Sequence, residues 1–168
     1  VAAPLQAPQR AIDDLLRLHA TWVIRKVHDW QQKRPPALSW VAGEHIMLYG
    51  TPVTLEAHAG IVLPQLEQDR LLFNPHLAPP VIESAVRNWL KQQALACFTR
   101  RCRDYSAHLD LPAPAVRLSN ARTRWGSCHA HGRISMNWRL VQGPMAWIEY
   151  VAAHEVAHLV EMNHSRRF

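Results

Sequence analysis

The sequence predicts an α+β fold, and two observations lead to that prediction. Apolar residues recur near the helical period of 3.6 in some segments and alternate at the strand period of two in others. Both kinds of segment occur in one chain of 168 residues, which is long enough for a domain with its own core. The composition, 48% apolar and 19% charged, is that of a globular protein and excludes a disordered chain.

Helices are expected near both ends of the chain and in its middle. From about Pro8 to Lys33 the apolar residues follow the helical period, and Arg34-Pro35-Pro36 ends this helix because proline cannot continue it. Val81 to His108 is predicted to be a long amphipathic helix. Gly143-Pro144 opens a last helix, which is expected to run to about Met162.

Strands are expected between these helices. Trp40 to His58 alternates on either side of Tyr49-Gly50-Thr51-Pro52 and predicts a hairpin, and Arg70 to Phe73 predicts a further short strand. The polar segment His129 to Gly132 suits a hairpin turn. The strands expected in the last third of the chain are Val116–Leu118, Thr123–Ser127 and Arg133–Trp138.

Composition also limits the partners and the location. A membrane partner is not expected, because no apolar run approaches the ~20 residues of a spanning helix. The formal net charge of +6 makes nucleic acid a candidate partner, although the basic residues are scattered and give it weak support. Cys97, Cys102 and Cys128 are an odd number of cysteines in a chain that needs no disulfides, so we expect reduced thiols in a cytoplasmic protein.

The segment His154-Glu155-Val156-Ala157-His158, inside the last predicted helix, is the candidate for chemistry. Residues four apart lie on one face of a helix, so both imidazoles can bind one metal ion. Glu155 lies about 100° further round the axis, from where its carboxylate can reach a water on the metal without binding the metal. This pattern is typical of a catalytic zinc site.

Two residues are candidates for the third metal ligand. Glu161 shares the helix face, but it lies seven residues beyond His154, and roughly 10 Å of helix axis is too far for one zinc ion. His164 is favoured, because Asn163 can adopt the left-handed conformation that ends a helix and turns the chain back. Glu161 is then a partner of a ligand or a surface carboxylate. With His158, the set predicts one Zn²⁺ per chain and an open fourth position, although imidazole also suits other divalent ions.

These residues predict metal-assisted hydrolysis. Zinc lowers the pKa of its bound water towards ~7 and polarises the substrate carbonyl. Glu155 is then the catalytic acid/base, which takes the proton of that water and later delivers it to the leaving group. The candidates for an additional oxyanion donor, each also explicable as a structural residue, are Arg124, His131, Arg139 and Tyr150.

Three blocks of the sequence resemble one family in the same order: Arg122–Cys128 (RTRWGSC), Ile134–Leu140 (ISMNWRL) and His154–Ser165. The family is that of the YgjP-like metallopeptidases, relatives of the SprT-like zincins. The close resemblance covers roughly residues 122–168. Residues 22–118 look like the family's upstream half, placed at about 1–114, but carry weaker motifs. Family members usually continue past the end of this chain into a further helix, so we expect more protein there.

The resemblance implies a single zincin-like metallopeptidase domain over residues 1–168, with its catalytic half at about 115–168. Its fold is expected to be a twisted, mostly antiparallel sheet packed on helices, one of which carries the HExxH motif as the active-site helix. The implied metal ligands are His154, His158 and His164, and the implied catalytic acid/base is Glu155.

The resemblance further implies that the strand around Trp125 to Cys128 borders the substrate cleft, where an edge strand can pair with an extended peptide. The candidate cleft residues are Arg124, Trp125, Gly126, Ser127 and Asn137. Trp125 and Trp138 are explained equally well as core residues and as a substrate wall.

Three functions remain open at this point. A zinc peptidase that acts on a peptide or protein is favoured, because a pure binding protein does not need an intact Glu155. A nucleic-acid- or protein-binding module with little turnover draws support from the basic charge, and salt-sensitive DNA binding after metal removal would favour it. A hydrolase of a non-peptide bond would use the same site, and substrate profiling would separate it from a peptidase.

Overall fold

The structure of the protein, a computed structural model, describes residues 8–33 and 37–165. The chain forms two compact units, Val1–Ala37 and Leu38–Phe168, and all the candidate site residues belong to the second. Among the described residues, no helix combines the length and the apolar composition that crossing a bilayer requires.

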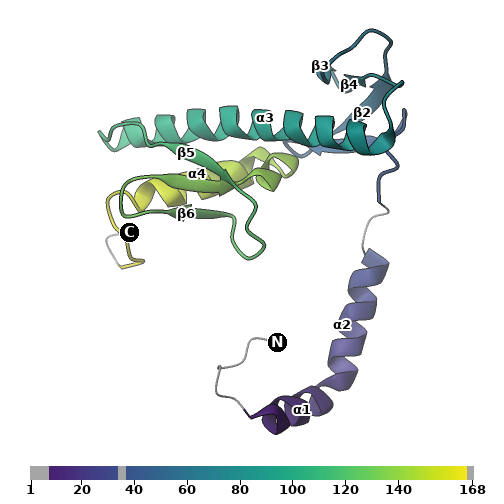
Figure 1. The fold of residues 1–168 in the computed structure, drawn as a ribbon. Coiled ribbons are helices and arrows are strands. Elements are labelled where there is room, and N and C mark those ends of the chain that lie inside the picture. Colours follow the sequence, from purple (N-terminus) through teal and green to yellow (C-terminus); the bar gives the residue numbers. More distant parts are fainter. Residues whose placement is uncertain (1–7, 34–36, 166–168) are drawn as a thin grey trace. The chain divides into compact units, whose positions relative to one another are not determined.

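The first unit contains two helices, α1 (Gln9–Leu18) and α2 (Ala20–Lys33), and the chain turns between them at His19 (Figure 1). The prediction of one continuous helix from Pro8 to Lys33 is therefore wrong. Periodicity reports which positions are apolar, and it does not report whether the backbone runs on without a break. The predicted stop at Arg34-Pro35-Pro36 lies outside the described residues.

A four-stranded sheet opens the second unit. β1 (His45–Leu48) and β2 (Thr51–Ala57) form the predicted antiparallel hairpin, and the two turn residues have the positive φ values, 52° and 82°, that a tight turn requires. β4 (Arg70–Phe73), also predicted, pairs parallel with β2. β3 (Gln65–Glu67) pairs antiparallel with β4 and was missed, because its three residues are all exposed and show no burial alternation. The strand order is β1-β2-β4-β3.

Glu44 holds the loop that leads into this sheet. Its carboxylate accepts hydrogen bonds from the backbone N–H groups of Ser39, Trp40 and Val41, at 2.9, 2.7 and 3.3 Å. The bond from Ser39 is the largest influence and lowers the pKa of Glu44; desolvation opposes it, and the bonds from Val41 and Trp40 lower the pKa further. The charged form of Glu44 therefore stabilises the loop.

We predict that Glu44→Gln lowers the thermal unfolding midpoint at neutral pH and that this deficit shrinks as the pH falls. The native pKa of Glu44 lies below its unfolded value, so its stabilisation is present above the unfolded pKa and is lost as the pH falls through the native one. Circular-dichroism melts between about pH 7 and about pH 3 measure this. Glu67→Gln, at an exposed position of β3, is the control, and a Glu44 deficit that stays constant over this range would contradict the assignment.

The second sheet has three strands, β5 (Val116–Ser119), β6 (Gly126–Cys128) and β7 (Ile134–Asn137). β7 is central, because it pairs parallel with β5 and antiparallel with β6, and β6 is therefore an edge strand. The predicted turn at His129–Gly132 joins β6 to β7, with a φ of 76° at its glycine. One sheet was expected, but the described residues form two. Of their five strand pairs three are antiparallel, as the expectation of mostly antiparallel pairing requires.

β6 begins later than the predicted strand Thr123–Ser127, and the side chain of Asn137 explains why. Asn137 is buried, and its Nδ2 donates to the carbonyl oxygens of Ala121, at 2.8 Å, and Arg124, at 3.5 Å. These bonds hold the segment as a loop, so that the ladder to β7 starts only at Gly126.

The short 3₁₀ helix η1 (Trp138–Gln142) and the helix α4 (Met145–Ala157) follow β7. α4 begins after Pro144, as the sequence predicts, but it ends at Ala157 and not at Met162. Beyond this point the N–H groups of residues 159 and 160 bond to the carbonyl groups three residues earlier, at 2.9 and 3.0 Å. The helix ends in these tighter turns, and the following residues no longer continue along its axis.

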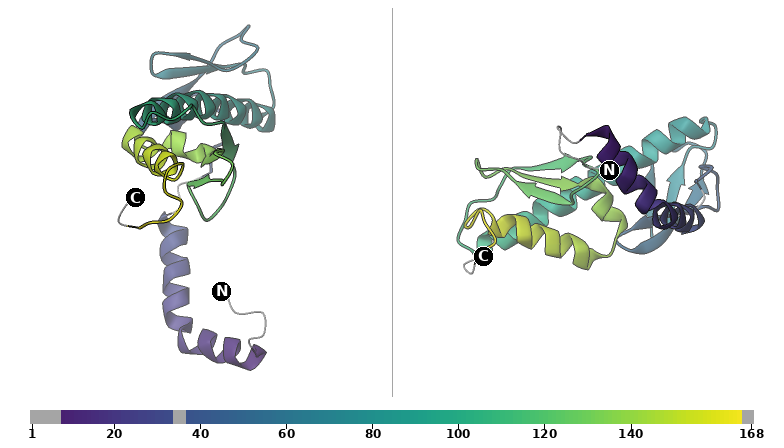
Figure 2. Two further views of the ribbon diagram at one scale, coloured as in Figure 1. Left: turned by 90° about the vertical axis from the view of Figure 1, so that its left-hand side faces the viewer. Right: turned by 90° about the horizontal axis from the view of Figure 1, so that it is seen from below.

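The long helix α3 (Pro79–His108) packs against α4, η1 and the strand β5 of the second sheet. Figures 1 and 2 show α4 and β5 running alongside it. Proline occupies its first two positions, where the missing N–H costs nothing, and the predicted helix at Val81–His108 is confirmed. Its buried residues are Ile82, Val86, Trp89, Leu90, Ala94, Cys97, Phe98, Cys102 and Ser106.

The three cysteines are free, as expected for reduced thiols. Cys97 and Cys102 are buried on the inner face of α3, and Cys128 is half-buried in β6. Burial, together with smaller repulsions from nearby acidic groups, raises the pKa of Cys102 to about 12, which keeps this thiol protonated and unreactive.

Candidate metal centre

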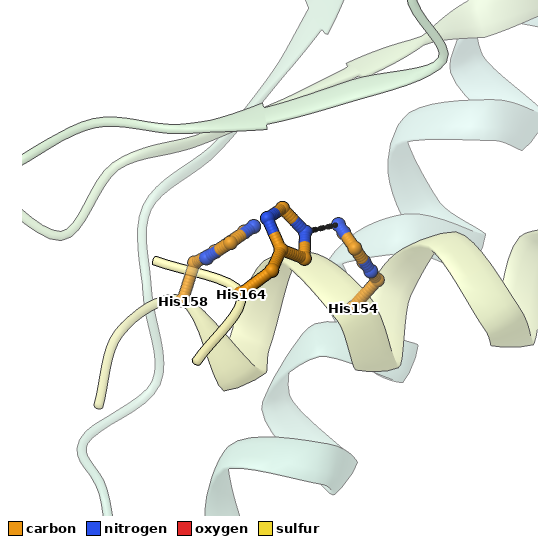
Figure 3. Close-up of side chains that lie close together, drawn as sticks. All are labelled: His154, His158 and His164. Carbon is orange, nitrogen blue, oxygen red and sulfur yellow. Dashed lines mark hydrogen bonds between the residues drawn. The ribbon is translucent and has the colours of Figure 1, made fainter. Parts of the chain in front are cut away.

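α4 places His154 in its last turn, and His158 follows directly after the helix ends. Because the two residues are four apart, their rings lie one turn apart on the same side of the helix. The ring centroids are 4.8 Å apart and the ring planes are nearly perpendicular, at 89°. Figure 3 shows the two rings projecting from the helix toward a common space.

His164 reaches the same space from the segment that follows α4 (Figure 3). Its Nε2 lies 3.2 Å from the Nε2 of His154, and its ring centroid lies 4.8 Å from that of His158. Asn163 makes the turn in a way that differs from the prediction: it does not adopt a positive φ, and its Oδ1 instead accepts the Ser165 N–H at 2.9 Å. The expectation that Asn163 ends the helix in a left-handed conformation is therefore wrong, since α4 already ends at Ala157.

Glu161, the other candidate for the third ligand, acts through its backbone. The Nδ1 of His158 lies 3.0 Å from the carbonyl oxygen of Glu161. A carbonyl group only accepts hydrogen bonds, so Nδ1 carries the proton and the lone pair of the His158 ring is on Nε2. The Glu161 carbonyl thereby orients the His158 ring, while the Glu161 carboxylate does not belong to the group of candidate ligand atoms.

The three imidazoles fit a zinc ion. One ring nitrogen from each of His154, His158 and His164 lies within 4.8 Å of the others. A tetrahedral zinc ion with bonds of about 2.0–2.1 Å holds its nitrogens roughly 3.3 Å apart, a spacing that one pair already has and that small side-chain rotations give the rest. Burial above all, and then the other two histidines, lowers the pKa of His154, which favours the neutral form that binds metal.

The composition of the cluster indicates an open site. Among the described residues, no cysteine, aspartate or glutamate adds a fourth atom to this group. Three protein ligands leave a coordination position for water or substrate, which is the arrangement of catalytic zinc sites, whereas structural sites are closed by four.

Glu155, next to His154, is buried where α4 meets β6, with only 5% of its surface exposed. Burial raises the pKa of its carboxyl; His158, a hydrogen bond from the Cys128 backbone and Arg124 oppose this rise, in that order. A carboxyl group with a raised pKa beside three converging imidazoles is a candidate for proton transfer.

The position of Glu155 depends on the absence of a side chain at Gly126. A Cβ built on Gly126 would overlap the Glu155 Oε1 and would lie 2.7 and 2.8 Å from its Cγ and Cδ. The carboxyl group therefore rests on the bare backbone of the edge strand. The resemblance implied that Gly126 borders the substrate cleft, but the sequence gives no sign of this contact, because the two residues are far apart in the chain.

The other candidate cleft residues differ in their surroundings. Arg124 and Trp125 are exposed immediately before β6, and Ser127 is half-buried within it. Asn137 is buried and acts on this region by holding the loop in front of β6. Trp138 is a core residue with 6% exposure, whereas Trp125, at 51%, is not.

The candidates for an oxyanion donor are also distributed unequally. Tyr150 stacks on His154, with ring centroids 6.0 Å apart, and Arg124 is close enough to lower the pKa of the buried carboxyl. Arg139 packs over a tryptophan ring and donates to an asparagine side chain in a separate hollow. His131 lies exposed in the turn between β6 and β7. Tyr150 and Arg124 are therefore the two that adjoin the site.

Comparison with known proteins identifies the family. The whole chain, residues 1–168, matches the family model described as YgjP-like, metallopeptidase domain. The chain belongs to the YgjP-like metallopeptidase family. No curated protein and no solved structure matches the chain significantly. The resemblance drawn from the three sequence blocks is confirmed. At the level of the family, this is a metal-dependent peptidase domain, which implies a metal ion and a peptide or protein substrate.

One feature of this YgjP-like site was missed in the sequence. Trp147 was not singled out, although it shares the helix face of Tyr150 and His154. Its spacing, three residues before Tyr150 and seven before His154, was the signal that could have found it.

We predict that Gly126→Ala lowers the free energy of unfolding by about 1–3 kcal/mol, because the added methyl group overlaps buried atoms. The same substitution in a Glu155→Ala background should cost much less, since the side chain it meets is gone. Urea unfolding of the four proteins gives the coupling between the two positions. Equal costs in both backgrounds would show that Glu155 does not rest on Gly126.

Proposed function

We propose that this protein is a zinc-dependent peptidase in which His154, His158 and His164 hold one Zn²⁺ per chain and Glu155 is the general acid/base. The observation that carries the proposal is a buried carboxyl group beside three imidazoles whose nitrogens converge. Burying a carboxyl group costs stability, so a scaffold that only binds would gain from an apolar residue there.

The chemistry divides between the metal ion and the chain. Bound zinc would supply a Lewis acid that acidifies water and polarises the scissile carbonyl group. A carboxylate oxygen of Glu155 takes a proton from the attacking water and later returns it to the leaving amine. The Glu161 carbonyl keeps the His158 ring in the orientation that metal binding needs. Arg124 and Tyr150 are the candidates for stabilising the charge that develops on the carbonyl oxygen.

β6 provides the wall along which an extended peptide would bind. It is one of the two edge strands of its sheet, and it lies along α4 (Figure 1). An edge strand offers backbone N–H and C=O groups that can pair with a substrate strand. Arg124, Trp125, Gly126 and Ser127 follow one another along this wall, and Asn137 supports it from β7.

We further infer that residues 1–168 act as one domain, because the family match spans all of them. Its catalytic half is residues 115–168, which contain β6, α4 and the histidine cluster. The free thiols are consistent with the expected cytoplasmic location.

The alternative, a binding module with little turnover, draws on a different part of the surface. A separate hollow is lined by Arg87, Lys91 and Arg139, three cationic side chains that suit a polyanion. DNA binding that weakens steeply with salt and persists after metal removal would favour this function. A hydrolase of a non-peptide bond shares the proposed site, and substrate profiling distinguishes it.

The purified protein is expected to contain about one zinc ion per chain, and His158→Ala is expected to lose it. His131→Ala, which removes an exposed imidazole from the turn between β6 and β7, is the matched control and should keep the metal. Elemental analysis by plasma mass spectrometry measures the content. A wild-type protein that holds no stoichiometric metal, even after zinc is added, would overturn the proposal.

Glu155→Gln is expected to retain zinc and to lower peptide hydrolysis by roughly 10²–10⁴-fold, because an amide cannot accept the proton. The amide has nearly the shape of the carboxyl group, so the contact with Gly126 remains. Cleavage of a degenerate peptide mixture, followed by mass spectrometry, and zinc content are measured on the same preparation. Full activity in this variant would assign the proton transfer to another group.

A further inference from the structure

An apolar hollow of about 290 Å³ opens beside α4. Its lining residues are Trp125, Leu140, Trp147, Tyr150 and Val151, none of which carries a charge. The two tryptophans and the tyrosine are more than half exposed, at 51%, 56% and 71%. Large aromatic side chains that gather at one point of the surface mark a place of interaction, whereas single exposed apolar residues do not.

The hollow adjoins the proposed catalytic site on two sides. Trp147, Tyr150 and His154 follow one another at helical spacing on one face of α4, and the Tyr150 ring stacks on His154 with centroids 6.0 Å apart. Across from them, Trp125 directly precedes the glycine that supports the proposed acid/base. The hollow is therefore an extension of the proposed catalytic site and not a separate pocket.

Its distance from the cluster suits a substrate side chain close to the cleaved bond. At 1.5 Å of rise per residue, Tyr150 and Trp147 lie roughly 6 and 10 Å from His154 along the helix axis. An extended peptide advances about 3.3 Å per residue. A peptide whose scissile bond lies at the histidine cluster thus brings one of its next three side chains to the hollow.

The shape of the hollow is preformed. Leu140 and Val151 make a buried floor, with 2% and 9% exposure. A Cβ on Gly143 would overlap the Trp147 ring and lie 2.8 Å from its Cζ3, so the indole rests on bare backbone. The backbone of Trp125 is also held, because its carbonyl oxygen accepts an N–H from β7 at 2.8 Å. Such preorganisation lowers the cost of binding.

We propose that this hollow is a specificity subsite that binds one large apolar side chain of the substrate, aromatic or branched aliphatic, within three residues of the cleaved bond. The inference rests on the proposed peptidase function. The volume of about 290 Å³ is at the lower end of the ~300–1,000 Å³ of ligand pockets, which is enough for one large side chain. A charged side chain would be buried there without a partner, which is unfavourable.

The test uses the full chain with zinc and peptides that differ at one position. Cleavage sites are first located by mass spectrometry of a degenerate peptide mixture. Matched peptides with Phe, Leu, Ala or Asp at each of the three flanking positions then give kcat/KM values. The wild type should prefer Phe and Leu over Ala by roughly tenfold to a hundredfold at one position, and Asp should be the poorest.

Two variants examine the hollow itself. Trp147→Ala removes a wall, and Gly143→Ala displaces the indole while its backbone, at φ −87° and ψ 172°, accepts alanine. Both should reduce the Phe-to-Ala ratio of kcat/KM at least fivefold while zinc content stays the same. Leu95→Ala, which truncates an exposed apolar residue of α3, is the control and should keep the wild-type ratio. A wild-type ratio in both hollow variants would overturn the proposal.

A binding measurement separates this subsite from the peptidase function. Fluorescence anisotropy with labelled Phe and Ala peptides is carried out on the Glu155→Gln protein. If this protein binds the Phe peptide more tightly than the Ala peptide, and adding Trp147→Ala abolishes the difference, the subsite is supported. This holds even if the wild type cleaves no peptide, and then only the proposed function fails. Cleavage without any side-chain preference overturns the subsite alone. Light scattering tests a different occupant. If the wild type is a dimer, Trp147→Ala is a monomer and both bind the peptides with equal affinity, the hollow is a contact with a second copy of the chain and the subsite proposal is overturned.

Discussion

The contact between the buried carboxyl group of Glu155 and the bare backbone of Gly126 sets the distance between α4 and the edge strand β6. A methyl group at Gly126 does not fit. The helix and the strand are therefore separated only by the Glu155 side chain. This approach removes the carboxyl group from water and raises its pKa. His154, the neighbour of Glu155, remains half-buried.

α4 can carry the candidate site because its two faces make different contacts. Ile148, Ala152 and Val156 are buried in the core with α3. The opposite face presents the aromatic residues that line the hollow and then His154 of the histidine cluster. An ion pair at 3.2 Å between Arg101 of α3 and Glu149 adds a polar contact between the two helices. The long helix thus anchors one face of α4, and the other is available for chemistry.

Glycine has the same role at two places in this region. Gly126 lets the carboxyl group rest on the strand, and Gly143 lets the Trp147 indole rest on the backbone before α4. In both cases the φ angle is ordinary, and it is the missing Cβ that matters. A glycine that is required because a neighbouring side chain packs against its backbone is hard to recognise in a single sequence, because glycine usually indicates a turn.

Local patterns in the sequence determined much of this protein. The hairpin of β1 and β2, the extent of α3, the start of α4 and the two histidines four apart all follow from periodicity, proline positions and helical spacing, which act over a few residues. The family followed from three blocks of residues in order. What only the tertiary structure decided depends on contacts between distant residues. The early end of α4, the late start of β6 behind the Asn137 hydrogen bonds, the division into two sheets and the close approach of Gly126 to Glu155 are of this kind. Such contacts depend on packing in three dimensions, and the spacing of residues along one chain does not encode them directly.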